Sequence, residues 1–281
     1  MDDLHSINAA INARAGRKLL PSIAVSIGLI LLVWSTLAFA REVFAVLIAV
    51  AVILGLREIK RAFTARKIHI SFRSLALATG GLTYATWFGG VGGLAVGTAI
   101  AFPVLMIALL RKGPDGFIAS ATATTLSLIY LPFLAGFLVL LARPSDGLAR
   151  VMTFVVLVGC NDTFAYLVGV LFGKHPLVPA ISPKKTWEGL AGSIIFTTVG
   201  GALSFIFILK LEWWIGVLVA FMIVFTATMG DLIESAMKRD MSIKDMGSLL
   251  PGHGGMLDRL DSVLLSAPAL WLALELVKRY S

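Results

Sequence analysis

The chain has 281 residues, of which 58% are hydrophobic and only 14% are charged, and its mean hydropathy is +0.92. These values lie far outside the usual range for soluble domains and exclude a soluble enzyme or binding module. The formal net charge is +8, and the single cysteine, Cys160, excludes an internal disulfide.

Apolar runs recur along the whole chain, and no stretch between them could form a sizeable soluble domain. The sequence predicts an all-α, polytopic bundle of transmembrane helices with about nine spans of the ~30 Å hydrocarbon core. The first run has spanning length and is expected to be a retained helix, although an uncleaved signal anchor would look the same. The nine spans are expected near residues 19–40, 43–56, 74–88, 91–110, 117–141, 150–172, 189–209, 213–237 and 262–277.

The basic residues indicate the orientation of these spans. Of the 24 Lys and Arg residues, alternation of the nine spans places 18 on the side of the N-terminus. The positive-inside rule then predicts an inner-membrane protein with its N-terminus in the cytoplasm and its C-terminus outside. The net charge thus indicates topology and attraction to anionic membrane lipids, with no nucleic acid as a partner. The six on the other side are Arg41, Arg143, Arg150, Lys210, Lys278 and Arg279.

The two halves of the chain differ in polarity. Residues 1–148 have no acid inside a predicted span and contain the glycine-rich segment 89–97, so we expect scaffold helices there. Residues 149–281 are expected to be the catalytic half, with cytoplasmic loops at 173–188 and 238–261. No internal repeat of the kind found in transporters is evident.

Two pairs of polar residues interrupt apolar runs in the second half. Asn161 and Asp162 lie inside one run, and Asp231 and Glu234 lie near the end of another. Ionisable groups at such depth cost a few kcal/mol, so they are candidates for function. The alternative is a polar clamp between helices.

The loop 173–188 carries a compact group of cations and hydroxyls ahead of an apolar helix. Lysines with Ser or Thr at a helix start suit phosphate oxygens. A lysine pair at this position is alternatively an anchor for lipid headgroups, and Trp187 is expected to be an interfacial anchor. The group consists of Ser182, Lys184, Lys185 and Thr186.

The segment from Asp231 to Asp261 combines acids, cations and a glycine turn. On a helix, Asp231, Glu234, Ser235 and Lys238 occupy positions i, i+3, i+4 and i+7 and share one face. Asp258 and Asp261 share a face if the next helix starts after Gly255. Carboxylates without cysteine partners suit Mg²⁺ better than Zn²⁺.

The other polar residues of this segment are expected to support the same chemistry. His253, within the turn "PGHGG", is expected to orient a phosphate or hold the loop, since a phosphate nucleophile needs no general base. Arg239, Lys244 and Arg259 alternate with acids, which favours a held network over a random charged surface. Acids for a cation and cations for phosphates are what phosphoryl or nucleotidyl transfer requires.

Residues 235–261 match the signature of the phosphatidate cytidylyltransferases, the CDP-diacylglycerol synthases, which the chain therefore resembles. The matching positions are Ser, two residues, Lys-Arg, four residues, Lys-Asp, then Pro-Gly-His-Gly-Gly, two residues and Asp-Arg-Leu-Asp. The resemblance extends through "SPKKTWEG", "FGKH" and "NDTFAYLVG" and covers about the last 120 residues. Phe164 and Val170 depart from the glycine and the Gly-Arg pair that are common in this family.

The resemblance implies transfer of CMP from CTP to phosphatidate, which yields CDP-diacylglycerol and pyrophosphate and requires Mg²⁺. It implies Asp231 and Asp258 as metal ligands, followed by Asp261 and Asp162. Ser182 and Asn161 would help to bind CTP. The sequence does not specify the oligomeric state, and a homodimer is one possible assembly. The residues that would hold phosphates are Lys184, Lys185, Lys238, Arg239 and Lys244.

Three alternatives remain open from the sequence. A CTP-dependent lipid kinase would use similar acids and cations but release CDP. An ion-coupled transporter would use Asp162 and Asp231 as its relay, and a structural membrane protein would bind anionic lipid without any dependence on CTP.

Overall fold

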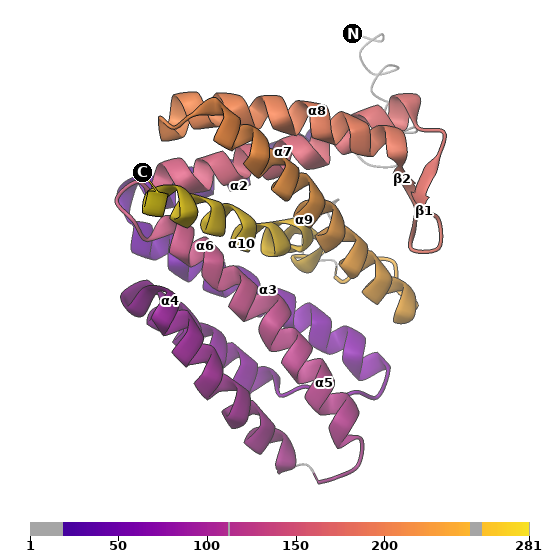
Figure 1. Cartoon of the computed structure of the whole chain (residues 1–281). Helices are drawn as coiled ribbons and strands as arrows, with labels where there is room; N and C mark the ends of the chain where they lie inside the picture. The colour runs from indigo at the N-terminus through magenta and orange to yellow at the C-terminus, as the bar shows by residue number, and fades with distance from the viewer. Residues whose placement is uncertain (1–18, 112, 248–254, 281) are drawn as a thin grey trace.

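The computed structural model describes residues 19–111, 113–247 and 255–280, and of the first helix it describes the side chains only from residue 27. The described chain consists of helices and one two-stranded antiparallel hairpin (Figure 1). Along the chain the elements are α2 (Leu19–Phe39), α3 (Arg41–Ala65), α4 (Phe72–Leu110), α5 (Phe117–Leu128), the π-helix η1 (Ile129–Phe133), α6 (Leu134–Ala142), α7 (Gly147–Phe172), β1 (Pro176–Val178), β2 (Ser182–Thr186), α8 (Trp187–Ser204), the π-helix η2 (Phe205–Leu209), α9 (Trp213–Asp240) and α10 (Leu257–Tyr280).

Six of the described helical segments are long and apolar enough to cross a membrane. The predicted all-α membrane bundle is therefore confirmed, and the described residues contain no soluble domain, whereas the count of nine spans is not confirmed. The helix α3 is outside the six, and its last turns carry a basic run that begins at Arg57. The six are Phe72–Leu110, Phe117–Ala142, Gly147–Phe172, Trp187–Leu209, Trp213–Asp240 and Leu257–Arg279.

The helix α4 contains a sharp reversal at Gly90, where the sequence predicts the boundary between two spans. Gly90 has φ +61° and ψ −141°, a conformation that favours glycine. A Cβ atom on Gly97 would lie 3.6 Å from side-chain atoms of both Leu82 and Ala85, which a straight helix would hold about 18 Å or more away. The segments before and after Gly90 therefore pack side by side as a tight helical hairpin.

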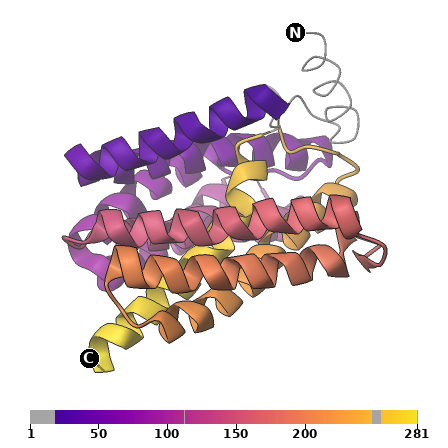
Figure 2. The same ribbon diagram turned by 90° about the horizontal axis from the view of Figure 1, so that it is seen from above.

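The connections that carry polar residues meet at one end of the bundle, which we call the loop end. Arg66, just after α3, donates hydrogen bonds to the carbonyl of Asp240 and, at 3.1 Å, to the hydroxyl of Ser242 beyond α9. Arg239 Nε donates to the carbonyl of Ile181 in the hairpin connection at 3.2 Å. Figures 1 and 2 show the hairpin and the C-terminus at opposite ends of the bundle.

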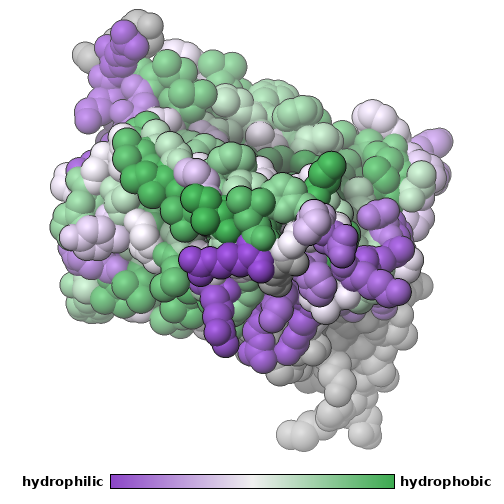
Figure 3. Space-filling model, turned by 90° about the horizontal axis from the view of Figure 1, so that it is seen from below, coloured by the Kyte–Doolittle hydropathy of each residue, from purple (hydrophilic) through white to green (hydrophobic). Residues whose placement is uncertain are grey.

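The apolar core lies in two clusters along the axis of the bundle. One cluster joins α3, α4, α5, α6 and α10, and the other joins α2, α6, α7, α9 and α10. Phe137 and Trp271, whose ring centroids are 5.4 Å apart, contact both clusters. Large apolar side chains also cover much of the outer surface, with hydrophilic residues gathered in separate groups (Figure 3). This outer surface is what helices that face lipid require.

Glycines bring α7, α8, α9 and α10 unusually close together. A Cβ on Gly192 of α8 would lie 2.5 Å from Val168 of α7, and one on Gly216 of α9 would lie 2.3 Å from the carbonyl oxygen of Gly201 of α8. A Cβ on Gly230 of α9 would lie 2.4 Å from the carbonyl oxygen of Asp261 in α10. Such close backbone approach is typical of helix packing in membranes, and the last contact sets the position of the polar site.

Candidate active site

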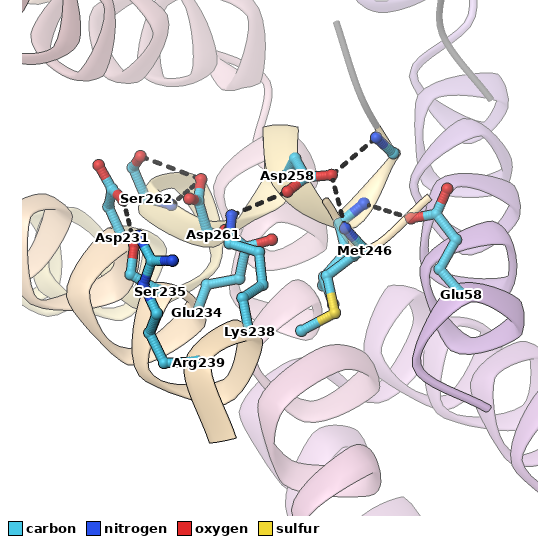
Figure 4. A network of polar contacts seen from close by, with 12 residues as sticks. Glu58, Asp231, Glu234, Ser235, Lys238, Arg239, Met246, Asp258, Asp261 and Ser262 are labelled. Carbon is cyan, nitrogen blue, oxygen red and sulfur yellow. Dashed lines mark hydrogen bonds and ion pairs between the residues drawn. The ribbon is translucent and has the colours of Figure 1, made fainter. Parts of the chain in front are cut away.

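The crossing of α9 and α10 brings the predicted acidic residues together. Asp231 directly follows Gly230, and the carbonyl of Asp261 is the group that Gly230 faces. A side chain at position 230 would push the two backbones apart, so glycine at this position lets acids from two helices share one site. Figure 4 shows Asp231 and Asp261 near one another within the polar network.

The loop 173–188 contributes a cation to this site. Lys185, on β2, extends its ammonium group to Asp231, and Nζ lies 2.6 Å from Oδ2. The other oxygen of Asp231 accepts a hydrogen bond of 3.3 Å from Ser235 one turn later on α9. The predicted phosphate-binding lysine and the predicted acid therefore meet directly, although 46 positions separate them in sequence.

The hairpin that carries Lys185 is held against the helices on both sides. Thr186 caps α8, because its Oγ1 accepts a hydrogen bond of 3.1 Å from the backbone N–H of Gly189. Glu188 accepts bonds from the backbone N–H groups of Lys174 and His175, and its Oε1 lies 2.6 Å from Nδ1 of His175. These contacts fix the start of α8 to the end of α7.

Lys238 is the centre of a second group of charges. Its Nζ lies 2.6 Å from Oε2 of Glu234 and 2.9 Å from Oδ1 of Asp258, so it links α9 to the first turn of α10. The other oxygen of Asp258 accepts hydrogen bonds from the backbone N–H groups of Gly255 at 2.7 Å and Met246 at 3.2 Å. Asp258 thus binds a lysine and two separate points of the connection between α9 and α10 (Figure 4).

A third group connects α7 to α10. Asn161 Nδ2 donates to Oδ1 of Asp162 at 2.9 Å, and the hydroxyl of Ser262 donates to Oδ2 of Asp162 at 3.4 Å. Asp261 accepts a 2.7 Å bond from the backbone N–H of Ser262. Because Gly230 of α9 packs on Asp261 and Ser262 of α10 bonds to Asp162 of α7, acids from three helices lie in one region.

The charge balance of these groups suits a bound cation. Acids outnumber lysines, and two buried oxygen atoms, Oε1 of Glu234 and Oδ1 of Asn161, have no hydrogen-bond partner among the described residues. All available donors are oxygen atoms, which Mg²⁺ prefers, so the residues fit this ion. No three His, Cys, Asp or Glu residues within the described ranges are gathered at ligand distance, and Asp231 and Asp258 are paired with Lys185 and Lys238. The acids are Asp162, Asp231, Glu234, Asp258 and Asp261.

The remaining predicted residues lie outside the three groups of contacts described above or at their edge. Lys184 and Lys244 are exposed, Ser182 begins β2, and Arg259 lies in the first turn of α10. Arg239 contacts the hairpin connection through Ile181, whereas His253 lies outside the described residues. The assignment of phosphate-binding and metal-binding roles to these residues stays a prediction.

Glu58 is a further residue of this region that is not among those predicted from the sequence. This acid lies on α3, in the half predicted to be scaffold, and its side chain is buried. Its carboxylate accepts hydrogen bonds from the backbone N–H groups of Met256 and Leu257, each 2.9 Å long. The sequence offers one signal: on a helix, Glu58 lies three residues after Gly55 and four before Ala62, both buried, although basic residues flank it.

The two residues that depart from the family signature, Phe164 and Val170, both lie on α7. The ring of Phe164 on α7 stacks on that of Phe196 on α8, with centroids 3.8 Å apart and planes 9° from parallel. Val170 is exposed on α7. Phe164 therefore adds contact between two helices that already pack together.

Comparison with known proteins agrees with this site. The sequence profile of the cytidylyltransferase family matches residues 22–277. Phosphatidate cytidylyltransferase of Mycobacterium leprae (strain TN) is 40% identical over an alignment of 283 positions, and the alignment covers 94% of this chain and 90% of the relative. The protein of the same name from Mycobacterium tuberculosis (strain ATCC 25618 / H37Rv) is 36% identical, with coverage of 96% and 86%. That of Staphylococcus haemolyticus (strain JCSC1435) is 38% identical over 61% of this chain and 65% of the relative.

Proposed function

The chain belongs to the cytidylyltransferase family, and on this basis we propose that it transfers CMP from CTP to phosphatidate, giving CDP-diacylglycerol and pyrophosphate for phospholipid synthesis. Relatives with this activity in their names match more than nine-tenths of the chain. The observation within the structure that supports the proposal best is the contact between Lys185 and Asp231. It unites the predicted phosphate-binding loop with the predicted acidic site.

The reaction needs little covalent chemistry from the protein. An oxygen of the phosphatidate phosphate attacks the α-phosphorus of CTP and forms a new P–O bond. The bond from that phosphorus to the β-phosphate oxygen breaks, and pyrophosphate leaves with the bonding electrons. Since the attacking phosphate is already anionic near neutral pH, positioning and charge neutralisation are the main tasks of the site.

The lysines of the network are placed for these tasks. Lys185 and Lys238 are paired with carboxylates, so a triphosphate can recruit their charge by replacing those partners. Asn161 and Ser182 are proposed to help seat the nucleotide, while the exposed Lys184 and Lys244 attract its phosphates. Arg239, in the last turn of α9, contacts the hairpin connection at the loop end and is proposed to bind phosphate as well.

Magnesium is proposed as the cofactor. Asp231 and Asp258 would hold it after releasing Lys185 and Lys238, with Asp261 and Asp162 as the next candidate ligands. When bound, Mg²⁺ would neutralise charge on the triphosphate and on the leaving pyrophosphate. The protein's own acids set the position of that charge relative to the two lysines.

The site is proposed to face the cytoplasm at the membrane surface. Most of the described basic residues lie near the loop end, and the positive-inside rule assigns such an end to the cytoplasm. CTP is then available from the aqueous side, while the acyl tails of phosphatidate remain among the helices and the surrounding lipid. A homodimer stays a prediction.

The reverse reaction tests the proposed chemistry. Purified protein with CDP-diacylglycerol, Mg²⁺ and labelled pyrophosphate should form labelled CTP, because CMP transfer is reversible at the same α-phosphorus. The other three nucleoside triphosphates should not support the forward reaction. Absence of exchange in a preparation that is active in the forward direction would count against cytidylyl transfer.

A further inference from the structure

Glu58 lies on α3, 198 residues before the segment that it contacts. Its side chain is only 4% exposed, and its neighbours Arg57, Lys60 and Arg61 are exposed on other faces of the same helix. An acid on the inward face of a helix is costly unless it has partners. The partners of Glu58 come from the start of α10 (Figure 4).

The carboxylate of Glu58 caps α10 from a different helix. Oε1 accepts the N–H of Met256 and Oε2 accepts the N–H of Leu257, the residue at which α10 begins. The first N–H groups of a helix have no partner within it, and a negative charge at this end also interacts favourably with the helix dipole. Two hydrogen bonds to one carboxylate fix both the position and the direction of the first turn.

Two glycines of the connection between α9 and α10 lie against the same carboxylate. A Cβ on Gly247 would lie 2.3 Å from Oε1 of Glu58, and a Cβ on Gly255 would lie 2.5 Å from Oε2. The φ of Gly247 is not positive, so what excludes a side chain there is the space that Glu58 takes. The acid is thus enclosed by two separate parts of the connection.

The contacts of Glu58 lead directly to the site. Gly255, which packs on Glu58, donates its N–H to Asp258, and Asp258 lies one residue beyond Leu257, whose N–H Glu58 accepts. Asp258 in turn holds Lys238 at 2.9 Å. A shift of the start of α10 would therefore move Asp258 and loosen its contact with Lys238.

We propose that Glu58 is a positioning residue for CMP transfer, which sets the place of Asp258 and Lys238 by holding the start of α10 and the two glycines of its connection. This inference rests on the proposed function. It also gives one residue of the first half of the chain a role in positioning the active site.

The first experiment replaces Glu58 in the full-length protein. Glu58→Gln keeps the shape but turns an NH₂ donor toward a backbone N–H, so one of the two bonds is lost. We expect kcat to fall by about 10²-fold, the effect of roughly an ångström of misplacement at a reacting centre. Glu42→Gln, an exposed acid at the other end of the same helix, is the matched control and should keep the wild-type rate.

A second measurement does not depend on activity. Hydrogen exchange of the amides of residues 255–260, followed by mass spectrometry, should be faster in Glu58→Gln than in the wild type. Exchange in α8 should be unchanged, because Glu58 does not contact it. Unchanged protection at 255–260 in the variant would overturn the inference, whether or not the wild type makes CDP-diacylglycerol.

A pair of substitutions that exchange side-chain volume between positions 58 and 247 distinguishes a loss of positioning from a general loss of stability. Gly247→Ala alone should clash with Glu58 and reduce kcat, and Glu58→Asp alone should pull the carboxylate back from Met256 and Leu257. Combined, the shorter acid makes room for the new methyl group, so the double variant should be more active than Gly247→Ala. Losses that simply multiply in the double variant, or a Glu58→Gln protein with more than half of the wild-type kcat, would contradict the inference. A wild type without CMP transfer but with the expected exchange pattern would refute only the proposed function.

Discussion

At the residue scale, Asp231 and Asp258 each join two parts of the site through charge. Asp231 binds Lys185 of the hairpin, and Asp258 binds Lys238 and two backbone N–H groups. An Asn at either position keeps the shape but removes the charge that balances a lysine and would balance a metal ion. The two acids therefore differ from those that only face solvent.

We predict that Asp231→Asn and Asp258→Asn each lower kcat by about 10²- to 10³-fold, which corresponds to a few kcal/mol of transition-state stabilisation. Steady-state rates with purified, folded variants at saturating Mg²⁺ and CTP measure this. Asp115→Asn, at an exposed acid in a connection, should keep the wild-type rate. Asp146 is a less suitable control, because it pairs with Arg150 at 2.9 Å. Variants of Asp231 and Asp258 that keep most of their activity would remove any metal-binding or charge-balancing role.

The sequence places Glu234 and Lys238 on the same helical face as Asp231 because the three occur at helical spacing within one segment, whereas Lys185 and Asp162 lie on other elements that only the fold brings to the site. Asp231, Glu234 and Lys238 share a face as that spacing requires, and Lys238 contacts Glu234 one turn away. Glu58 could not be predicted in the same way. Its partners are backbone N–H groups far along the chain, and backbone groups leave no pattern in the residues that carry them.

At the element scale, the crossing of α9 and α10 is the structural basis of the site. We predict that Gly230→Ala destabilises the protein by about 1–3 kcal/mol, because the added methyl would meet the carbonyl of Asp261 at 2.4 Å and no flexible side chain can move aside. The temperature of thermal unfolding in detergent should decrease. The value of kcat should decrease too, since the separation of Asp231 and Asp261 also changes.

A glycine in open space provides the control for this prediction. Gly80 on α4 has nothing within 4 Å of an added Cβ, so Gly80→Ala should change stability by about 1 kcal/mol or less and leave kcat unchanged. Equal effects at Gly80 and Gly230 would show that helix propensity, and not the crossing, determines the result.

Helix positions in the second half were largely predictable from hydropathy. The predicted span 150–172 corresponds to α7 at Gly147–Phe172, and 262–277 corresponds to α10, which starts earlier at Leu257. The span covers only the apolar part of the helix; the shared face of Asp258 and Asp261 required a helix start just after Gly255, and Glu58 caps that start through the backbone N–H groups of Met256 and Leu257. The short β1–β2 hairpin and the reversal within α4 depend on contacts that a hydropathy pattern does not contain.

At the scale of the whole molecule, the central question is which side of the membrane the loop end faces. We predict that a cysteine introduced by Lys67→Cys, in a Cys160→Ser background, is labelled by an impermeant thiol reagent only after the cytoplasmic side is opened. A cysteine from Lys210→Cys, between α8 and α9, should be labelled in intact cells. The reason is the excess of basic residues near the loop end. The reverse pattern would overturn the proposed orientation.

The most direct measurement of the central claim follows the phosphorus atoms of CTP. Purified protein is incubated with phosphatidate, Mg²⁺ and CTP that carries a radioactive label on either the α- or the γ-phosphate. CMP transfer predicts that the α-label enters the lipid as CDP-diacylglycerol and that the γ-label leaves as pyrophosphate. A lipid product that carries the γ-label, with CDP released, would contradict the account and identify a CTP-dependent lipid kinase.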